Sequence, residues 1–211
     1  MAFYHGPRIV TNGLIMLFDA VNPKSYPGSG TAWNDLLGNY TGTITGGTTS
    51  LTNGHMDLGP SGLVQINWGN GINPFSEEYT MIGLIKAPLI TGAGMWLDYG
   101  TNGTNQRFYS SLNDLGTQAE GFADIPARDT DWHMNTIVTN GSGNISLFQD
   151  DYQLEESRTV TSYTIGSNFE LGGRASYYWD GLFDYWAVYD RALTKDEILQ
   201  NYNALKGRYQ V

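Results

Sequence analysis

The sequence of 211 residues contains no cysteine, which rules out a disulfide framework and a zinc site built from thiolates. Charged residues are also scarce, because they make up only 15% of the chain, whereas roughly a quarter is usual in soluble proteins. A surface with so little charge must be covered by Ser, Thr, Asn and Gly. That composition is typical of extracellular β-proteins and of virus shells.

Basic residues are the scarcer of the charged residues. The chain has 11 Lys and Arg against 21 Asp and Glu, its formal net charge is -10, and its basic residues form no cluster. Such a surface repels phosphate backbones, so we expect no nucleic-acid partner.

Long hydrophobic runs are missing as well. No segment is long and apolar enough to span a bilayer, so we expect no membrane partner. The first residues, MAFYHGPRIVTNGL, lack the charged stretch and apolar run of a signal peptide. We therefore expect synthesis in a host cytoplasm, with any work outside the cell beginning after lysis or as part of a particle.

What the chain does have is apolar and aromatic residues in short runs. Hydrophobic residues make up 40% and aromatic residues 13% of the sequence, which is enough for a sizeable core. Sandwiches and barrels commonly reach this length undivided, so residues 1–211 are expected to form a single domain.

The short runs have the periods of β-strands. Residues 13–20 (GLIMLFDA) form a continuous apolar run, whereas residues 41–45 and 63–68 alternate with a period of two. Asn140 to Asn144 (NGSGN) supply the residues of a hairpin turn. Further strands are expected at residues 79–88, 95–100, 107–112, 133–140, 144–150 and 158–166.

One helix is expected near the C-terminus. Thr194 and Glu197 form a capping box, because each side chain can accept a hydrogen bond from the amide of the other residue. Gly207 is the expected stop. The apolar stripe of this helix consists of Ile198, Leu199, Tyr202 and Leu205. Many strands with one short C-terminal helix predict an all-β fold, a jelly-roll β-sandwich of two antiparallel sheets.

The C-terminal third resembles the closing strand and helix of laminin-G-like, concanavalin A-like jelly rolls of the lectin and glucanase group. The matching residues are Gly181, Phe183, Asp184, Val188, Tyr189, Arg191, Ala192, Leu193, Glu197 and Ile198. Upstream, the Trp–His strand and the hairpin of this family match at Trp132, His133, Leu147 and Phe148.

The N-terminal stretch LIMLFDAVNPKSYPGSGTAWNDLLGN resembles the version of this fold found in structural proteins of tailed bacteriophages. The residues that carry the resemblance are Asp19, Asn22, Ser25, Tyr26, Pro27, Gly28, Gly30, Trp33, Asp35, Leu36, Gly38 and Asn39. We interpret Tyr26 and Trp33 as closing one end of the sandwich, and Asp35 and Asn39 as bonding turn amides.

The closing strand departs from the family pattern. Tyr185, Trp186 and Ala187 stand where a second acidic residue, an aliphatic residue and a basic residue are usual. This face is more apolar than the family's, which predicts a subunit interface at Tyr185, Ala187 and Tyr189.

The sequence offers poor material for catalysis. Retaining glycosidases need two carboxyl groups about 5 Å apart, and the related glucanases supply them from one strand in a Glu-x-Asp-x-(x)-Glu pattern. No such pattern is present, and the adjacent acidic pairs would point to opposite faces of a strand, so we interpret them as solvated turn charges. These pairs are Glu77–Glu78, Asp150–Asp151 and Glu155–Glu156.

A hydrolytic triad is equally poorly supported. The only histidines are His5, His55 and His133, and the sequence contains no Gly-x-Ser-x-Gly elbow. We interpret His133 as a satisfied histidine near the edge of the core. The chain is therefore predicted not to be an enzyme.

Glycan binding needs aromatic faces beside amides and carboxylates in loops, and two stretches have that mixture. The candidates are Trp96, Tyr99, Asn102, Tyr177, Tyr178 and Trp179. The alternative interpretation places Trp96 and Trp179 in the core or in a subunit contact. No cofactor is expected from the residues, although the resemblance implies that one Ca²⁺ can be bound; no spacing of acidic residues selects its site.

These observations favour a non-catalytic structural or adhesion protein of a phage virion surface, as a head decoration, a fibre or a baseplate-associated protein. Its partners would be other virion proteins or further copies of itself. The alternative function is a carbohydrate-binding module that recognises a host surface glycan.

Overall fold

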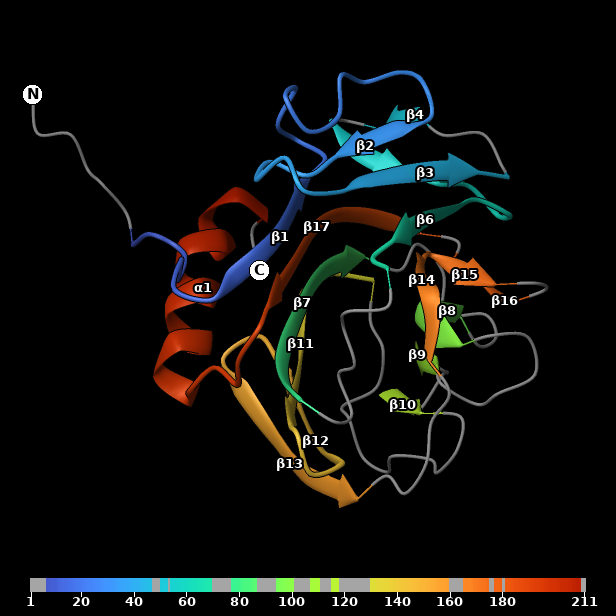
Figure 1. Cartoon of the computed structure of the whole chain (residues 1–211). Helices are drawn as coiled ribbons and strands as arrows, with labels where there is room; N and C mark the ends of the chain where they lie inside the picture. The colour runs from blue at the N-terminus through green and yellow to red at the C-terminus, as the bar shows by residue number, and fades with distance from the viewer. Residues whose placement is uncertain are drawn as a thin grey trace, which may run out of the picture.

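The computed structural model describes residues 7–46, 50–52, 54–69, 77–86, 94–100, 107–110, 115–117, 130–159, 165–174, 177–179 and 181–209. Two antiparallel sheets are stacked face to face, and one helix, α1 (Lys195–Tyr209), covers the outer face of the larger sheet (Figure 1). The predicted all-β jelly roll with one short C-terminal helix is confirmed.

The larger sheet is eight-stranded and has the order β13-β12-β11-β7-β17-β5-β4, with β1 also paired to β17. Its strands are β1 (Leu14–Asp19), β4 (Ser50–Thr52), β5 (His55–Asp57), β7 (Glu78–Lys86), β11 (Trp132–Asn140), β12 (Asn144–Gln149), β13 (Tyr152–Thr159) and β17 (Leu182–Tyr189).

The smaller sheet is seven-stranded and has the order β10-β9-β8-β14-β6-β3-β2. Its strands are β2 (Ala32–Asn34), β3 (Thr41–Thr45), β6 (Leu63–Asn67), β8 (Gly94–Gly100), β9 (Arg107–Ser110), β10 (Leu115–Thr117) and β14 (Ile165–Leu171). A separate two-stranded ribbon joins β15 (Gly173–Arg174) to β16 (Tyr177–Tyr178).

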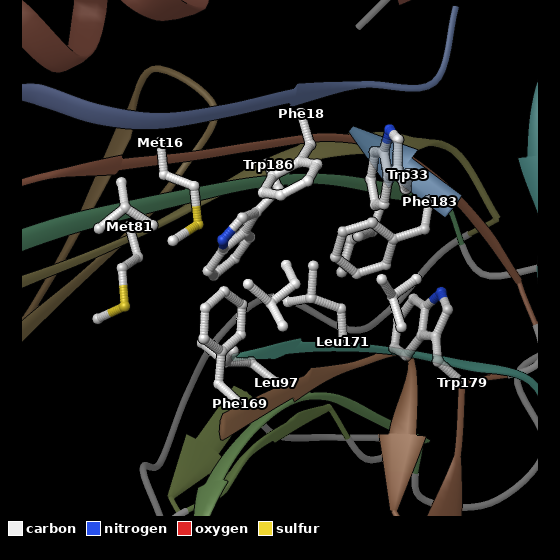
Figure 2. Close-up of a cluster of buried hydrophobic side chains, with 14 of the residues drawn as sticks. Met16, Phe18, Trp33, Met81, Leu97, Phe169, Leu171, Trp179, Phe183 and Trp186 are labelled. Carbon is white, nitrogen blue, oxygen red and sulfur yellow. The ribbon is translucent and has the colours of Figure 1, made fainter. Parts of the chain in front are cut away.

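The main core lies between the two sheets, where aromatic side chains from both meet (Figure 2). Trp186 of β17 packs against Phe169 of β14, with 5.8 Å between ring centroids. Trp33 of β2 packs against Phe18 of β1 at 5.2 Å. Each of these contacts joins a strand of the larger sheet to a strand of the smaller sheet.

A second apolar layer lies between the larger sheet and α1. It contains Leu84, Tyr185 and Ala187 from the sheet, and Ile198 and Leu205 from the helix. The central strands β7 and β17 are therefore buried on both faces, which explains their continuous apolar sequences.

The strand predictions hold where the pattern alternates. In β6, Val64 and Ile66 are fully buried and point to the core, with Gln65 between them on the other face. The hairpin between β11 and β12 turns through Gly141 and Gly143, whose φ angles are 70° and 81°. The strand expected at residues 158–166 is wrong as a single element, because β13 ends at Thr159 and β14 begins at Ile165. Pro88, expected to end β7, lies outside the described residues.

The capping box of α1 is confirmed. The amide of Glu197 donates to Oγ1 of Thr194 at 3.3 Å, and the amide of Thr194 donates to Oε2 of Glu197 at 2.9 Å. The end of the helix is corrected: α1 continues through Gly207 to Tyr209. Leu199 is also corrected, because it is 42% exposed and does not belong to the buried stripe.

A bidentate ion pair between Arg191 and Glu197 joins the first turn of α1 to the loop that precedes it. Arg191 donates to both carboxylate oxygens of Glu197, at 2.9 Å and 2.6 Å. Arg191, together with the Thr194 amide, lowers the pKa of Glu197 to about 2. Gly13 lies beneath this pair with a φ of 77°, and a Cβ there would be 2.9 Å from the carboxylate of Asp190 and 3.0 Å from Arg191.

Among the described residues, no helix combines the length and the apolar character that crossing a bilayer requires.

Glu197→Gln is expected to lower the free energy of unfolding by about 1 kcal/mol at neutral pH, the usual value of a helix cap. Because the folded pKa of Glu197 is depressed, its contribution exists above the ordinary value of 4.5 and disappears as the pH falls toward about 2. Thermal unfolding of the wild type and of Glu197→Gln between pH 2 and 7 should therefore give Tm values that converge at the acid end. Asp196→Asn, in the same exposed turn, serves as the control. A Tm difference between Glu197→Gln and the wild type that stays constant across this pH range would contradict the role of the Glu197 carboxylate as a cap.

Candidate functional site

Of the six residues proposed from the sequence as a glycan site, only Tyr178 and Trp179 have side chains in the described part of the chain. Trp96 and Tyr99 belong to β8, but their side chains, like that of Tyr177 and all of Asn102, lie outside the described residues. Tyr178 of β16 is half-buried.

Trp179 is only 3% exposed and belongs to the core between the sheets (Figure 2). Its ring therefore cannot stack on a sugar in this conformation. This placement agrees with the alternative interpretation, in which Trp179 packs in the core.

The predicted interface residues Tyr185, Ala187 and Tyr189 are 2%, 0% and 0% exposed within the single chain. The chain's own helix covers them, so this placement corrects the prediction of a subunit interface at these three residues. Tyr189 also holds the N-terminal segment, because its hydroxyl donates to the carbonyl of Val10 at 2.9 Å. Two of the three residues that depart from the family pattern, Tyr185 and Ala187, thus form part of the surface on which α1 packs.

The N-terminal signature forms a structural brace, defined here by Asp19, Ser25, Tyr26, Trp33 and Asp35. Tyr26 and Trp33 are 2% and 0% exposed and belong to the main core, where they were expected. The hydroxyl of Ser25 accepts from the amide of Asp19 at 3.1 Å and donates to the carbonyl of Asn34.

Asp35 is the polar centre of the brace. One carboxylate oxygen accepts from the amides of Leu17 at 2.8 Å and Leu37 at 3.0 Å, and the other accepts from the amide of Asn39 at 3.0 Å. The prediction that Asp35 bonds turn amides is confirmed. The side chain of Asn39 instead donates to the carbonyl of Ile15 at 3.4 Å, so its predicted role is wrong.

The brace is also attached to α1. Arg208, near the end of the helix, donates to both carboxylate oxygens of Asp19 at 2.8 Å and 2.9 Å. The first strand, the signature loop and the C-terminal helix therefore form one connected unit.

Two histidines lie in pairs of the same design. In the first, His133 Nδ1 lies 2.7 Å from Oδ2 of Asp150, whose Oδ1 accepts from the amide of Met134 at 2.8 Å. His133, at the start of β11, is thus satisfied, as predicted. Asp150 is not a solvated turn charge, because it fastens the β12–β13 turn to the start of β11.

In the second pair, His55 Nδ1 contacts Oδ2 of Asp184, and Oδ1 of Asp184 accepts from the amide of Met56 at 2.9 Å. The Asp184 side chain is 0% exposed and that of His55 is 27% exposed. Burial raises the pKa of Asp184, while hydrogen bonds from His55 and Met56 oppose this and the nearby Asp19 adds to it.

The structure places two further acidic residues opposite each other in the smaller sheet. Glu170 of β14 is the register partner of both Asp98 on β8 and Gln65 on β6. The Gln65 amide donates to the Glu170 carboxylate at 3.2 Å. A search for acidic residues along one strand misses these register partners, because the two residues are 72 positions apart (170 − 98) and only the strand register joins them. Within the described ranges, no group of three or more His, Asp or Glu side chains could hold a metal ion.

A sandwich of two antiparallel sheets with a polar outer face and a helix-covered opposite face defines a lectin-like jelly roll. A laminin-G-type family model, described as the concanavalin A-like lectin/glucanases superfamily, matches residues 72–199. The chain belongs to this superfamily.

Solved structures that match this fold over part of their length include a sialidase and toxin binding domains. A Trypanosoma rangeli sialidase in complex with 2,3-difluoro-KDN superposes with a TM-score of 0.74 at 14% identity, over 94% of this chain and 33% of the sialidase chain. The binding domain of botulinum neurotoxin DC in complex with SialylT gives 0.67 at 14% identity, over 92% and 51%. The same domain in complex with rat synaptotagmin II gives 0.68 at 14% identity, over 92% and 52%.

The chain spans between about a third and about half of the length of these structures, and at such low identity the likeness shows the fold alone. No curated protein matches the chain. Since a shared fold does not fix function, function must be argued from the residues of the chain itself.

Asp35→Ala is expected to lower the free energy of unfolding by about 2 kcal/mol or more, because three amides would lose a charged acceptor and a hydrogen bond to a charged group contributes about 1.5–3 kcal/mol. Urea unfolding followed by tryptophan fluorescence measures the change. Asp151→Ala, an exposed carboxylate, is the matched control and should stay within about 0.5 kcal/mol of the wild type. Equal stability of the two variants would show that Asp35 does not organise the brace.

Proposed function

We propose that this chain is a non-catalytic adhesion module on the surface of a tailed-phage particle, as a head decoration, a fibre or a baseplate-associated protein. The observation that carries the proposal is the brace. Five of the residues that carry the resemblance, Asp19, Ser25, Tyr26, Trp33 and Asp35, are buried, and the hydrogen bonds of this group extend through Asp19 and Arg208 to α1.

A non-catalytic role is supported by what the polar side chains of the described residues do. The carboxylates of Asp35, Asp150 and Asp184 each accept hydrogen bonds from backbone amides, so they hold strands and turns together. A general acid or base must reach a substrate proton. Asp35 and Asp184, which are 5% and 0% exposed, do not reach the surface.

Adhesion to a particle requires a complementary surface rather than a reactive group. A durable attachment would bury about 1,000 Å² or more in total. With charged residues at 15% of the chain, such a surface carries a small desolvation cost.

The virion role predicts that the chain is present in intact particles. Phage particles should be purified from lysates of the host that expresses the gene, washed at high salt and analysed by mass spectrometry. The expected result is a fixed number of copies per particle that survives the wash. Presence in the lysate but absence from the washed particles would rule out this role.

A second candidate function is glycan binding, and one observation favours it. On the outer face of the smaller sheet, Thr43, Gln65 and Glu170 lie in one row across β3, β6 and β14. The Thr43 hydroxyl and the Gln65 amide, whose nitrogen is held by Glu170, can donate to and accept from sugar hydroxyls. The botulinum neurotoxin binding domain crystallised with SialylT has the same fold.

Glycan binding at this row predicts that Gln65→Ala lowers the affinity for a bound glycan at least about tenfold, a loss of about 1.4 kcal/mol. A glycan array probed with the wild type, with Gln65→Ala and with the control Asp151→Ala tests this, once in Ca²⁺ and once in a chelator. Signals that need Ca²⁺ would support the calcium implied by the family resemblance.

The array also separates the competing functions. A blank array would leave adhesion to the particle as the remaining role. Hydrolysis of an arrayed glycan that disappears in Glu170→Gln would replace both proposals with a glycosidase, in which Glu170 and Asp98 act as the carboxyl pair.

A further inference from the structure

A strap near the N-terminus, defined here as residues 8–10, runs beside α1 (Figure 1). Val10 is 7% exposed, and both Ile9 and Val10 pack in the apolar layer between the larger sheet and α1. The strap therefore covers part of the interior of the molecule, although it precedes the first strand.

Two buried side chains hold both backbone groups of Val10. Its amide donates to Oδ1 of Asn201 at 2.8 Å, and its carbonyl accepts from the Tyr189 hydroxyl at 2.9 Å. The side-chain amide of Asn201 also donates to the Tyr189 hydroxyl at 3.2 Å, which links the two. Both residues are 0% exposed with the strap in place, so its removal would break two hydrogen bonds and uncover the apolar layer. The folded protein is therefore most stable with an extended segment in this position.

The strap site, defined here as Tyr189, Gln200 and Asn201, binds the strap mainly through its backbone. Gln200 completes the set, because its side-chain amide donates to the carbonyl of Arg8 at 2.8 Å. Three hydrogen bonds thus go to backbone groups of the strap, and the Val10 side chain supplies the apolar anchor. None of these contacts depends on how the strap is connected to the rest of the chain. The strap of a second copy, which has the same sequence, fits the site equally well.

A tight turn at residues 11–14 connects the strap to β1. The amide of Leu14 donates to the carbonyl of Thr11 at 3.2 Å, and Gly13 between them has a φ of 77°. This backbone conformation suits glycine and strains a residue with a side chain. A Cβ at residue 13 would also lie 2.9 Å from Oδ1 of Asp190. Gly13 is therefore what allows the strap to fold back onto its own copy.

We propose that the strap site is an interaction surface for a second copy of this chain. In the resulting dimer each copy places its strap in the strap site of the other, and the turn at residues 11–14 opens into a hinge. The hydrogen bonds and the apolar anchor of each strap are the same in the dimer as in the single chain, so the difference between the two forms lies in the two turns. Tyr189 stays covered by its own α1 in both forms, and its hydroxyl binds the incoming strap.

The balance between the two forms depends on how closely the copies are held together. A strap on a short connection has an effective concentration of about millimolar at its own site, so the single chain keeps its strap in dilute solution. Copies fixed side by side on one surface reach a comparable local concentration, and there the exchange joins neighbours through contacts that each strap already makes. Exchange of straps does not depend on the proposed function, because any surface that gathers copies of the module favours it.

Gly13→Val tests the exchange in the full-length chain. Valine at a positive φ strains the closed turn of each copy, but it leaves the strap site unchanged. Opening relieves two strained turns per dimer, so the dimer dissociation constant should fall at least about tenfold relative to the wild type. Light scattering after size-exclusion chromatography at a series of protein concentrations measures this change.

Two further variants separate strap exchange from other causes of association. Gly38→Val places the same strain at a φ of 82° in another turn, with nothing within 4 Å of the added Cβ, so it should remain as monomeric as the wild type. Gly13→Val combined with Val10→Asp should also be monomeric, because a carboxylate cannot replace the apolar anchor. A monomeric Gly13→Val protein, or a dimer that persists with Val10→Asp, would overturn the proposal.

A cross-linking measurement locates the straps even if Gly13→Val is poorly stable. The chain has no cysteine, so Arg8→Cys and Gln200→Cys can be introduced in separate copies that keep the wild-type turn. Gln200→Cys removes one hydrogen bond of the strap site but keeps the apolar anchor at Val10. The two proteins are mixed at high concentration and treated with a short bis-maleimide.

Strap exchange predicts a linked heterodimer of Arg8→Cys with Gln200→Cys, at a yield well above that of Arg8→Cys mixed with the exposed control Asp151→Cys. Equal yields from the two mixtures would show that each strap stays on its own copy, and strap exchange would then be rejected.

Discussion

Burial of β7 and β17 on both faces is the constraint on which the rest of the structure depends. One face packs against the smaller sheet, where Trp186 meets Phe169, and the other lies under α1. A β-bulge after Phe183 allows this, because it resets the alternation so that Phe183 and Trp186 both point into the main core while Tyr185 points to the helix. The helix is therefore a third layer of the fold and not an appendage.

A fold with so much buried strand must satisfy its polar groups internally, and this chain does so with carboxylates. Asp35, Asp150 and Asp184 each accept backbone amides at a place where the sheet ladder ends: a turn, a hairpin and a change of neighbour. Each replaces a missing strand partner. The acidic composition of the chain is thus in part structural, and net charge alone says little about its ligands.

The local features of the fold could be predicted from the sequence, whereas the pairings between distant segments could not. Alternation identifies β3 and β6, and the Thr194–Glu197 spacing identifies the start of α1, because these signals involve residues a few positions apart. His55 and Asp184 are 129 positions apart, and Glu170 and Asp98 meet only through the register of β14 and β8. An apolar strand also does not reveal what covers it. For that reason the face at Tyr185 indicated a partner subunit, although the chain's own helix covers it.

The strap formed by residues 8–10 fixes the orientation of the module. Arg8 and Val10 are held by Gln200 and Asn201 of α1, and Arg208 at the other end of the helix is fastened to Asp19. Both ends of the described chain therefore leave from the helical side of the molecule (Figure 1). Any tether through either end would place the helical side toward the anchor and leave the outer face of the smaller sheet pointing away from it.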